Sequence, residues 1–598
     1  MTRFSRLPVA LGGLGAVVVL GVGASFAVGG TDNPTNDVRS ALDGHKPKNV
    51  ILLIGDGMGT QEITAARYYN GVNTRLNVDR LKFTGFDTTW SVKPAASAPY
   101  TPDLDPDSAS TGTEWATGSK TLDERISQGP SSAIGVPGTN DLKTVLESWQ
   151  DAGAKVGDVS TAEITDATPA VQASHISLRG CQGPNDMGSC PTSELKANGG
   201  LGSIAEQEVD HGVDVLLGGG RNRFDDTIAG GPDDGKTVIQ SAQDKGYQYV
   251  TDATGLAGVT DKSKPVLGLF TGGNMTTEFS GTASTLGTGT TVTCNESARP
   301  AGEPSLEAMT TKALGLLEND KGFFLQVEGA SIDKQDHSAN ACGQIGETLA
   351  FDRAIGVALD YQAAHPDTLV VVTADHAHTS QIVADDASGT GLPTGYSTKL
   401  TTRDGATLAL TYGTAGFGGA GNAPVTTPPS QQHTGSVVPV WAIGPQASAV
   451  LGTNDHTDLY DLLRGGKVSQ DAPSNTTTVT ETVTGPTKTV TGPTKTVTGP
   501  TTTVTVPAKP AAPRVGLAIG SASRRGGVSV SVAVVDAQGV KIALKQGGKT
   551  LSSKNLNNAG GPVKLDASKA KKGSVTVTVT ASGDGGKTTK SASVKLKR

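Results

Sequence analysis

Apolar and polar positions form a repeating pattern along the body of the chain. Short, nearly continuous apolar stretches are each followed by glycine or acidic residues and then by segments with helical periodicity. The clearest stretches are residues 48–54, 213–217, 322–327, 368–373 and 437–443. Strands that are apolar on both faces suit a mostly parallel sheet covered by helices on both sides. The pattern therefore predicts an α/β domain over residues 46–472, built as a three-layer α/β/α sandwich.

The pattern changes near residue 473. Residues 473–513 are rich in Thr, Val and Pro, with the sequence TKTVTGP recurring every seven residues from Thr487 and Thr494. Such a segment cannot build a core, so we expect an extended linker. Beyond it, residues 527–535 and 573–581 alternate between apolar and polar side chains over strand lengths. We predict a small all-β accessory domain at 514–598, organised as a sandwich.

The N-terminus has the pattern of an export signal. A short basic segment is followed by an apolar run from Leu7 to about Val28, with the small-residue sequence Ser-Phe-Ala at 25–27. We predict a signal peptide at 1–28, a linker at 29–45, and an exported, extracellular or envelope-associated protein. An uncleaved segment of this length would act as a membrane anchor instead, because about 20 apolar residues span a bilayer.

Charge and cysteine content refine this picture. Residues 508–598 contain 17 Lys and Arg but only three Asp, a net charge of +14, which leaves −21 on the remainder of a chain whose total is −7. A basic C-terminal domain could contact the cell wall or other anionic polymers; the alternative is a solvated Lys-rich surface. No nucleic-acid recognition is expected.

The four cysteines are even in number and lack C-x-x-C spacing, which favours disulfides over a zinc ribbon in an exported chain. Three pairings are possible. The sequential one closes the shortest rings and is the one we expect: Cys181 with Cys190, and Cys294 with Cys342.

Acidic and imidazole side chains follow the predicted strands. Asp56, Glu328 and Asp375-His376 each come directly or almost directly after a strand, and Asp333 and His337 follow shortly after Glu328. Ligands bind beyond the carboxyl ends of such strands. Carboxylates and imidazoles without thiolates suit zinc, manganese or magnesium, and the carboxylates would repel one another without cations. A single Asp at a strand end is more often a helix cap or turn residue, but the whole set indicates a metal cluster.

A candidate nucleophile lies at the start of a predicted helix. Ser108 stands in Asp107-Ser108-Ala109-Ser110, which leads into a segment with helical periodicity. The N-terminus of a helix favours an anion beside it. Taken alone, a serine at this position is more often the cap of that helix than a nucleophile.

These residues and their surrounding blocks resemble the bacterial alkaline phosphatases. The resemblance covers about residues 46–466 and is carried by NVILLIGDGMG (49–59), STAEITDATPAVQASHISLR (160–179), KGFFLQVEGASIDKQDHSA (321–339), CGQIGET (342–348), TADHAHTSQIV (373–383) and HTGS (433–436). It implies two zinc ions and one magnesium ion per subunit, a homodimer, and hydrolysis of phosphate monoesters at alkaline pH through a covalent phosphoserine at Ser108. The implied site residues are as follows: zinc 1, Asp333, His337 and His433; zinc 2, Asp56, Ser108, Asp375 and His376; magnesium, Asp56, Asp166, Thr168 and Glu328; substrate, Asp107, Arg179 and Lys334.

The implied roles agree with the chemistry of these residue types. The planar guanidinium of Arg179 can meet two phosphate oxygens at once. Lys334 and Asp166 are expected to pair near the phosphate and favour magnesium over a third zinc. We expect His378 to orient a metal ligand, and we interpret His175 as structural.

Two alternatives stay open from sequence. One is a phosphodiesterase or sulfatase with the same metal core, although a C-x-P-x-R sulfatase motif is missing from the sequence. The other is a non-catalytic surface protein that keeps the fold and binds anionic polymers. No motif indicates a dedicated substrate pocket, so we expect broad tolerance of the leaving group.

Overall fold

The computed structural model describes residues 46–465 and 514–596, except 287–289, 386–394, 416–429, 524–526, 536–538, 557–559 and 584–585. The predicted signal at 1–28 and the predicted linkers at 29–45 and 473–513 lie outside the described residues. Within those ranges, no helix combines the length and the apolar character needed to cross a membrane.

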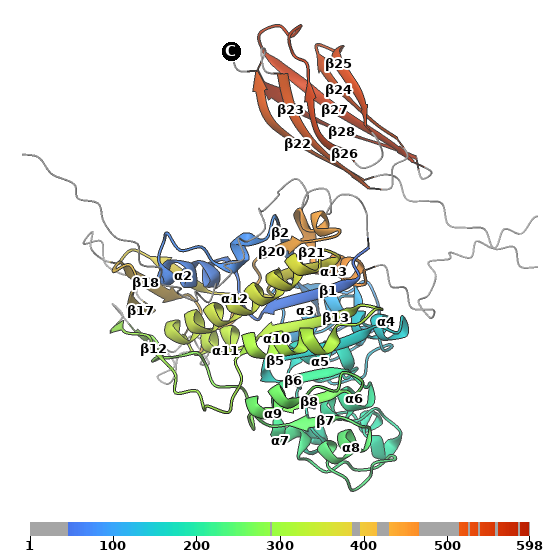
Figure 1. Ribbon diagram of the computed structural model, residues 1–598, viewed down its shortest axis with the longest axis vertical. Helices are drawn as coiled ribbons and strands as arrows, with labels where there is room; N and C mark the ends of the chain where they lie inside the picture. The colour runs from blue at the N-terminus through green and yellow to red at the C-terminus, as the bar shows by residue number, and fades with distance from the viewer. Residues whose placement is uncertain are drawn as a thin grey trace, which may run out of the picture.

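A ten-stranded sheet forms the centre of the body (Figure 1). Its strands, in spatial order, are β21 (Gly452–Asp455), β2 (Phe83–Thr88), β20 (Val438–Ile443), β14 (Thr368–Thr373), β1 (Asn49–Gly55), β13 (Phe323–Gly329), β5 (Lys155–Glu163), β6 (Val215–Gly219), β8 (Val266–Leu269) and β7 (Gln248–Val250). Only β20 runs antiparallel to its neighbours in this sheet. The predicted mostly parallel sheet is confirmed.

Helices cover both faces of the sheet, as the apolar strands require. The helices are α2 (Thr60–Asn70), α3 (Ser108–Thr117), α4 (Val145–Asp151), α5 (Ala167–Ala173), α6 (Ile204–Asp210), α7 (Arg221–Phe224), α8 (Val238–Asp244), α9 (Ala253–Gly258), α10 (Leu306–Leu317), α11 (Ser331–His337), α12 (Ala341–Ala364) and α13 (Leu459–Leu463). Alternate residues of β1 show the two faces. Ile51 and Leu53 pack in one apolar core with α10 and α12, whereas Leu52 and Ile54 pack in another with α3 and α4. This is the predicted three-layer sandwich.

Short strands lie outside the central sheet. A second sheet contains β10 (Thr285–Leu286), β11 (Thr290–Val292), β16 (Ser380–Val383), β17 (Tyr396–Thr401) and β18 (Thr407–Tyr412). Two-stranded pairs are formed by β3 (Ser91–Val92) with β4 (Pro102–Asp103), β9 (Phe279–Ser280) with β12 (Asn295–Glu296), and β15 (Ala377–His378) with β19 (His433–Thr434).

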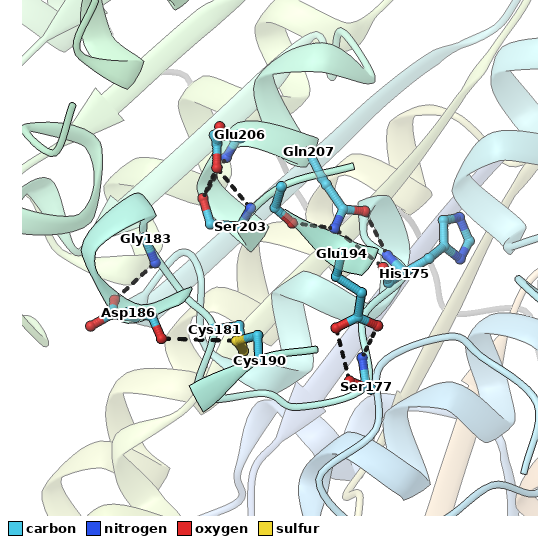
Figure 2. Close-up of a disulfide and its surroundings, with 11 residues drawn as sticks. His175, Ser177, Cys181, Gly183, Asp186, Cys190, Glu194, Ser203, Glu206 and Gln207 are labelled. Atoms are coloured by element: carbon cyan, nitrogen blue, oxygen red, sulfur yellow. Dashed lines mark hydrogen bonds between the residues drawn. A yellow bond between two sulfur atoms is a disulfide. The ribbon is translucent and has the colours of Figure 1, made fainter. Parts of the chain in front are cut away.

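Both disulfides of the sequential pairing are present. Cys181 bonds to Cys190, as Figure 2 shows, and Cys294 bonds to Cys342. The second bridge joins the residue before β12 to the first turn of α12, so it fastens an irregular segment to the longest helix among the described residues.

Residues 514–596 form two antiparallel sheets with an apolar core of their own. One sheet contains β22 (Arg514–Ser523), β23 (Gly527–Val535) and β26 (Gly560–Leu565), and the other β24 (Gly539–Gln546), β25 (Lys549–Leu556), β27 (Ser574–Gly583) and β28 (Gly586–Lys595). Val530, Ile542 and Val577 are among the buried residues that both sheets contribute to this core. The region is all-β, as the alternating pattern predicted.

Candidate active site

The predicted metal ligands converge because the strands that carry them are neighbours. Strand β1 pairs in parallel with both β13 and β14, so the residues at their carboxyl ends meet at one edge of the sheet. Asp56 follows β1 directly, and its amide donates to the Gly329 carbonyl at 3.3 Å. Glu328 lies inside β13, one residue before its end, rather than after the strand as the sequence pattern indicated.

The turn after β1 is shaped for close approach. Gly57 has a φ of 67°, and a Cβ at this position would lie 2.6 Å from the His378 ring. Its amide donates to Asp375 Oδ1 at 2.8 Å. Glycine therefore allows the β1 turn and the segment after β14 to touch.

One group of metal-ligand side chains surrounds Ser108. The His376 Nε2 atom lies 3.5 Å from Asp56 Oδ1 and 3.3 Å from Asp375 Oδ2, and it lies 3.2 Å from Ser108 Oγ. All four side chains are buried. The structure thus brings together the four residues expected at zinc 2.

Ser108 is the first residue of α3 and does not cap it. The cap is Asp107, whose Oδ1 accepts a hydrogen bond from the Ser110 amide at 3.0 Å. Because a neighbouring residue satisfies the helix end, the Ser108 hydroxyl can face the cluster instead. The alternative interpretation of Ser108 as a helix cap is therefore wrong.

A second group contains Asp333, His337 and His433. Asp333 Oδ1 lies 3.3 Å from His337 Nε2 and 3.4 Å from His433 Nε2, and the two nitrogens are 3.1 Å apart. Tetrahedral zinc with bonds of about 2.0–2.1 Å places its ligand atoms about 3.3 Å from one another. These three atoms therefore have the spacing of one face of a zinc tetrahedron.

Backbone carbonyls orient both imidazoles of this group. His337 Nδ1 faces the Gln431 carbonyl at 2.6 Å, and His433 Nδ1 faces the Pro106 carbonyl at 3.0 Å. A carbonyl oxygen only accepts, so each Nδ1 carries a proton, and in the neutral imidazole each Nε2 presents its lone pair toward Asp333. Metal-binding histidines have this arrangement.

His378 contacts a predicted ligand, as expected. Its Nε2 lies 2.6 Å from Asp333 Oδ1, and the pairing of β15 with β19 sets it opposite His433. Burial lowers the pKa of His378 to about 4. The contact fixes the orientation of the Asp333 carboxylate.

The first two groups have the donor chemistry of a cation site. The buried atoms Asp56 Oδ1 and Asp375 Oδ2 have no hydrogen-bond partner among the described residues. Burial, and next to it the charge of Asp375, raises the pKa of Asp56 well above its usual range. Divalent cations would satisfy these oxygens and remove the repulsion. The residues therefore fit the metals that the sequence implied.

A third group lies beside α5. Thr168 is buried in the first turn of this helix, and Ser160 Oγ donates a short hydrogen bond to Glu328 Oε2. Burial raises the pKa of Glu328 to about 7, although the bond from Ser160 opposes the rise. Glu328 and Thr168 were expected at the magnesium position together with Asp166 and Asp56.

Asp166 connects this third group to the expected substrate residues. It accepts Lys334 Nζ at 2.6 Å through Oδ2 and Arg179 Nη2 at 2.9 Å through Oδ1. Burial would raise the pKa of Asp166, but the two cations hold it well below its usual range. Arg179 Nη1 also donates to Asp107 Oδ2 at 3.2 Å. Two carboxylates therefore fix the plane of the Arg179 guanidinium.

A cavity of about 460 Å³ opens over these groups. Its wall contains the guanidinium of Arg179, the carboxylate of Asp107 and both oriented imidazoles, and the full lining is Asp105, Asp107, Glu124, Arg179, Gly180, Gln182, His337, Gln432 and His433. Sequence reasoning missed Asp105, Glu124 and Gln432, because no motif pointed to them. Glu124 adopts a φ of 68°, and its amide donates to Asp107 Oδ2 at 3.0 Å.

Comparison with known proteins bears directly on this site. The sequence profile of the alkaline phosphatase family matches residues 47–465. A streptomycin-6-phosphate phosphatase from Streptomyces griseus is 44% identical over 71% of this chain and 92% of its own length. An alkaline phosphatase from Escherichia coli K12 is 43% identical over 73% and 89%, and alkaline phosphatase H from Pseudomonas aeruginosa is 42% identical over 72% and 87%.

Proposed function

Since this chain belongs to the alkaline phosphatase family, we propose that each subunit uses two zinc ions and one magnesium ion. The reaction that these ions assist is the hydrolysis of phosphate monoesters. Zinc 1 would be held by Asp333, His337 and His433. Zinc 2 would be held by Asp56, Asp375, His376 and the hydroxyl of Ser108. Magnesium would be held by Asp56, Thr168, Glu328 and, through water, Asp166. When bound, these cations supply charge that stabilises a serine alkoxide, a leaving alkoxide and the transferring phosphoryl group.

Ser108 is the nucleophile. Its Oγ forms a bond to phosphorus while the bond from phosphorus to the ester oxygen breaks, and the alcohol leaves. Water then attacks the phosphoserine, releases inorganic phosphate and restores the hydroxyl. The amide dipoles at the start of α3 favour the negative charge that develops at this position.

Arg179 binds the phosphoryl group. Its planar guanidinium carries five N–H donors. One on Nη1 bonds to Asp107 and one on Nη2 bonds to Asp166, which holds the plane in place and leaves a second N–H on each nitrogen for the phosphate. A preorganised fork costs little reorganisation when the phosphate arrives. Lys334 acts through Asp166, which it neutralises at 2.6 Å.

The observation that carries this proposal is the position of the Ser108 hydroxyl. It lies 3.2 Å from His376 Nε2, which itself lies within 3.5 Å of two buried carboxylates. A hydroxyl at a helix start, next to a group of metal donors and near a cavity that holds a fixed guanidinium, suits nucleophilic attack on a phosphate.

Three further proposals rest on sequence and family rather than on this geometry. The protein is exported, it forms a homodimer, and its basic C-terminal domain contacts the cell wall or another anionic polymer. The cavity is open and lined mainly by polar groups, which supports broad tolerance of the leaving group.

Hydrolysis of p-nitrophenyl phosphate by the purified full chain tests the proposal. We expect strong activity with zinc and magnesium, loss of activity after chelation, and a fall of at least about 10³-fold in Ser108→Ala and Asp56→Ala. The control is Ser338→Ala, which removes an exposed hydroxyl that bonds to the Lys334 carbonyl and should keep activity.

Two results would contradict it. Retained turnover in Ser108→Ala would exclude the phosphoserine route. An inactive, fully metal-loaded wild type that cleaves a diester or a sulfate ester would show that the substrate class is wrong.

A further inference from the structure

A fourth group, made of histidine and glutamate side chains, lies apart from the candidate active site. Glu147 stands in the first turn of α4, His175 follows α5, and His211 is the C-cap of α6. The Glu147 Oε1 atom lies 3.2 Å from His175 Nε2 and 3.3 Å from His211 Nε2. All three ligand atoms lie within 4.8 Å of one another. Three separate segments of the chain thus meet at one carboxylate oxygen.

The opposite ring nitrogens are already used. His175 Nδ1 faces the Ser127 carbonyl at 2.9 Å, and His211 Nδ1 faces the Gln207 carbonyl at 3.0 Å. Because a carbonyl cannot donate, each Nδ1 carries a proton. In its neutral form, each imidazole therefore directs the lone pair of Nε2 toward the carboxylate of Glu147.

Two arrangements relieve that repulsion at both nitrogens. Either both histidines take a second proton and become imidazolium ions that donate to the same oxygen, or a cation lies between the three atoms. Burial lowers the pKa of His175 while the Glu147 carboxylate raises it, and the net shift is upward. The imidazolium arrangement would place two positive charges beside each other, and like charges at this spacing repel. A divalent cation satisfies both lone pairs and the carboxylate together.

The distances also favour a cation. Hydrogen bonds between an imidazolium and a carboxylate are usually about 2.7–2.9 Å, shorter than the 3.2 and 3.3 Å observed here. Tetrahedral zinc with bonds of about 2.0–2.1 Å sets its ligand atoms about 3.3 Å apart. The two nitrogen-to-oxygen distances therefore match edges of a zinc tetrahedron.

The surroundings hold each donor in place. The Thr144 amide donates to Glu147 Oε2 at 2.8 Å, which leaves Oε1 to the histidines. The backbone amide of His175 donates to the Gln207 side chain at 2.8 Å, and Gln207 donates back to the His175 carbonyl at 3.2 Å, as Figure 2 shows. Gln150 of α4 donates to the His211 carbonyl at 3.0 Å. These contacts fix the backbone at both histidines.

We propose that His175 Nε2, His211 Nε2 and Glu147 Oε1 bind one additional zinc ion, with water as the fourth ligand. The ion would clamp α4, the segment after α5 and the end of α6 to one another. The side chain of His175 is 7% exposed, that of Glu147 is 13% exposed and that of His211 is 24% exposed. The ion can therefore enter from solvent on the His211 side. The role is structural, and it does not depend on the mechanism at Ser108.

Zinc counting on the full chain tests the proposal. Wild type, His211→Gln, Glu147→Gln and the control His365→Gln are equilibrated with excess zinc chloride, freed of unbound metal, and analysed by elemental mass spectrometry. His365 also faces a single glutamate, Glu318, at 3.4 Å but has no second histidine beside it among the described residues. We expect His211→Gln and Glu147→Gln to hold one zinc fewer than wild type and His365→Gln to hold the same number. Equal zinc content in His211→Gln and wild type would overturn the proposal.

A measurement on the wild type alone avoids any folding defect of the variants. Diethylpyrocarbonate modifies accessible neutral imidazoles, and peptide mass spectrometry locates the modified histidines. We expect zinc to protect His211 at least about tenfold relative to the chelated protein, while His365 reacts equally in both samples. Equal modification of His211 with and without zinc would refute the site. Turnover of p-nitrophenyl phosphate should be unchanged in His211→Gln. Failure of the additional zinc site can therefore be distinguished from failure of the phosphoserine mechanism.

Discussion

Replacing Arg179 with lysine should weaken phosphate binding without removing the charge. The guanidinium of Arg179 is held by Asp107 at 3.2 Å and Asp166 at 2.9 Å and lines the cavity. Lysine keeps the positive charge but concentrates it at one nitrogen, so it cannot offer two parallel N–H donors to two phosphate oxygens.

The magnitude follows from the hydrogen bond that is lost. A hydrogen bond to a charged group contributes about 1.5–3 kcal/mol, and each 1.4 kcal/mol corresponds to about tenfold in affinity. We therefore expect the inhibition constant of inorganic phosphate to rise by about 10–100-fold. The kcat/KM for p-nitrophenyl phosphate should fall by a similar factor, because substrate and product present the same oxygens to Arg179.

The structure offers a matched control for this substitution. Arg223 also bridges two carboxylates, Glu163 and Asp186, each at 2.9 Å, yet it is not part of the cavity wall within the described residues. Both variants are compared with wild type by steady-state kinetics with added phosphate, and by thermal unfolding. Arg223→Lys should leave the inhibition constant unchanged. A shift below twofold in Arg179→Lys, or an equal shift in both variants, would refute the assigned role.

Three other perturbations test stability and organisation. Burial raises the pKa of Glu347 from 4.5 to about 7. Between these pH values the folded state keeps a proton that the unfolded state has lost, so the free energy of unfolding falls as the pH rises. Urea denaturation should show Glu347→Gln gaining up to about 3 kcal/mol relative to wild type between pH 4.5 and 8, and a constant difference would contradict this. Replacing Cys294 and Cys342 with alanine opens a ring with a sequence separation of 48 and should lower the free energy of unfolding by about 4 kcal/mol. The same change at Cys181 and Cys190, with a separation of 9, should lower it by about 2.6 kcal/mol. Denaturant unfolding measures both, and the reverse order would refute the loop-entropy argument. Removing residues 474–598 should leave kcat/KM for p-nitrophenyl phosphate within about twofold of the full chain, because the all-β region has its own core. A large loss of turnover would show that the region supports the active site.

The central sheet and the groups at its edge could be predicted because their signals are local. A strand buried on both faces needs a continuous apolar stretch, and β1, β13 and β14 each have one. The expected metal ligands come at the carboxyl ends of these stretches, and parallel pairing brings such ends to one edge of the sheet. The positions of Asp56 and Asp375 were therefore readable from the pattern of residues before any fold was known.

Other features depended on contacts that no pattern records. Whether Ser108 capped α3 or faced the cluster was decided by the Asp107 side chain, which bonds to the Ser110 amide. Glu124 lines the cavity from a backbone with positive φ. Residues other than glycine rarely adopt this conformation, so the sequence did not predict it.

Periodicity and composition act over short stretches of chain. They were therefore enough to predict the layer architecture, the all-β character of the C-terminal region and the residue types available for chemistry. Which donors share an oxygen depends instead on how distant segments of the chain pack. Glu147, His175 and His211 come from three segments and follow no common spacing, and His175 was interpreted from sequence as merely structural. Only the packing of α4, α5 and α6 turns two imidazoles toward one carboxylate, since the direction of a side chain is set by the neighbours that bond to its other end.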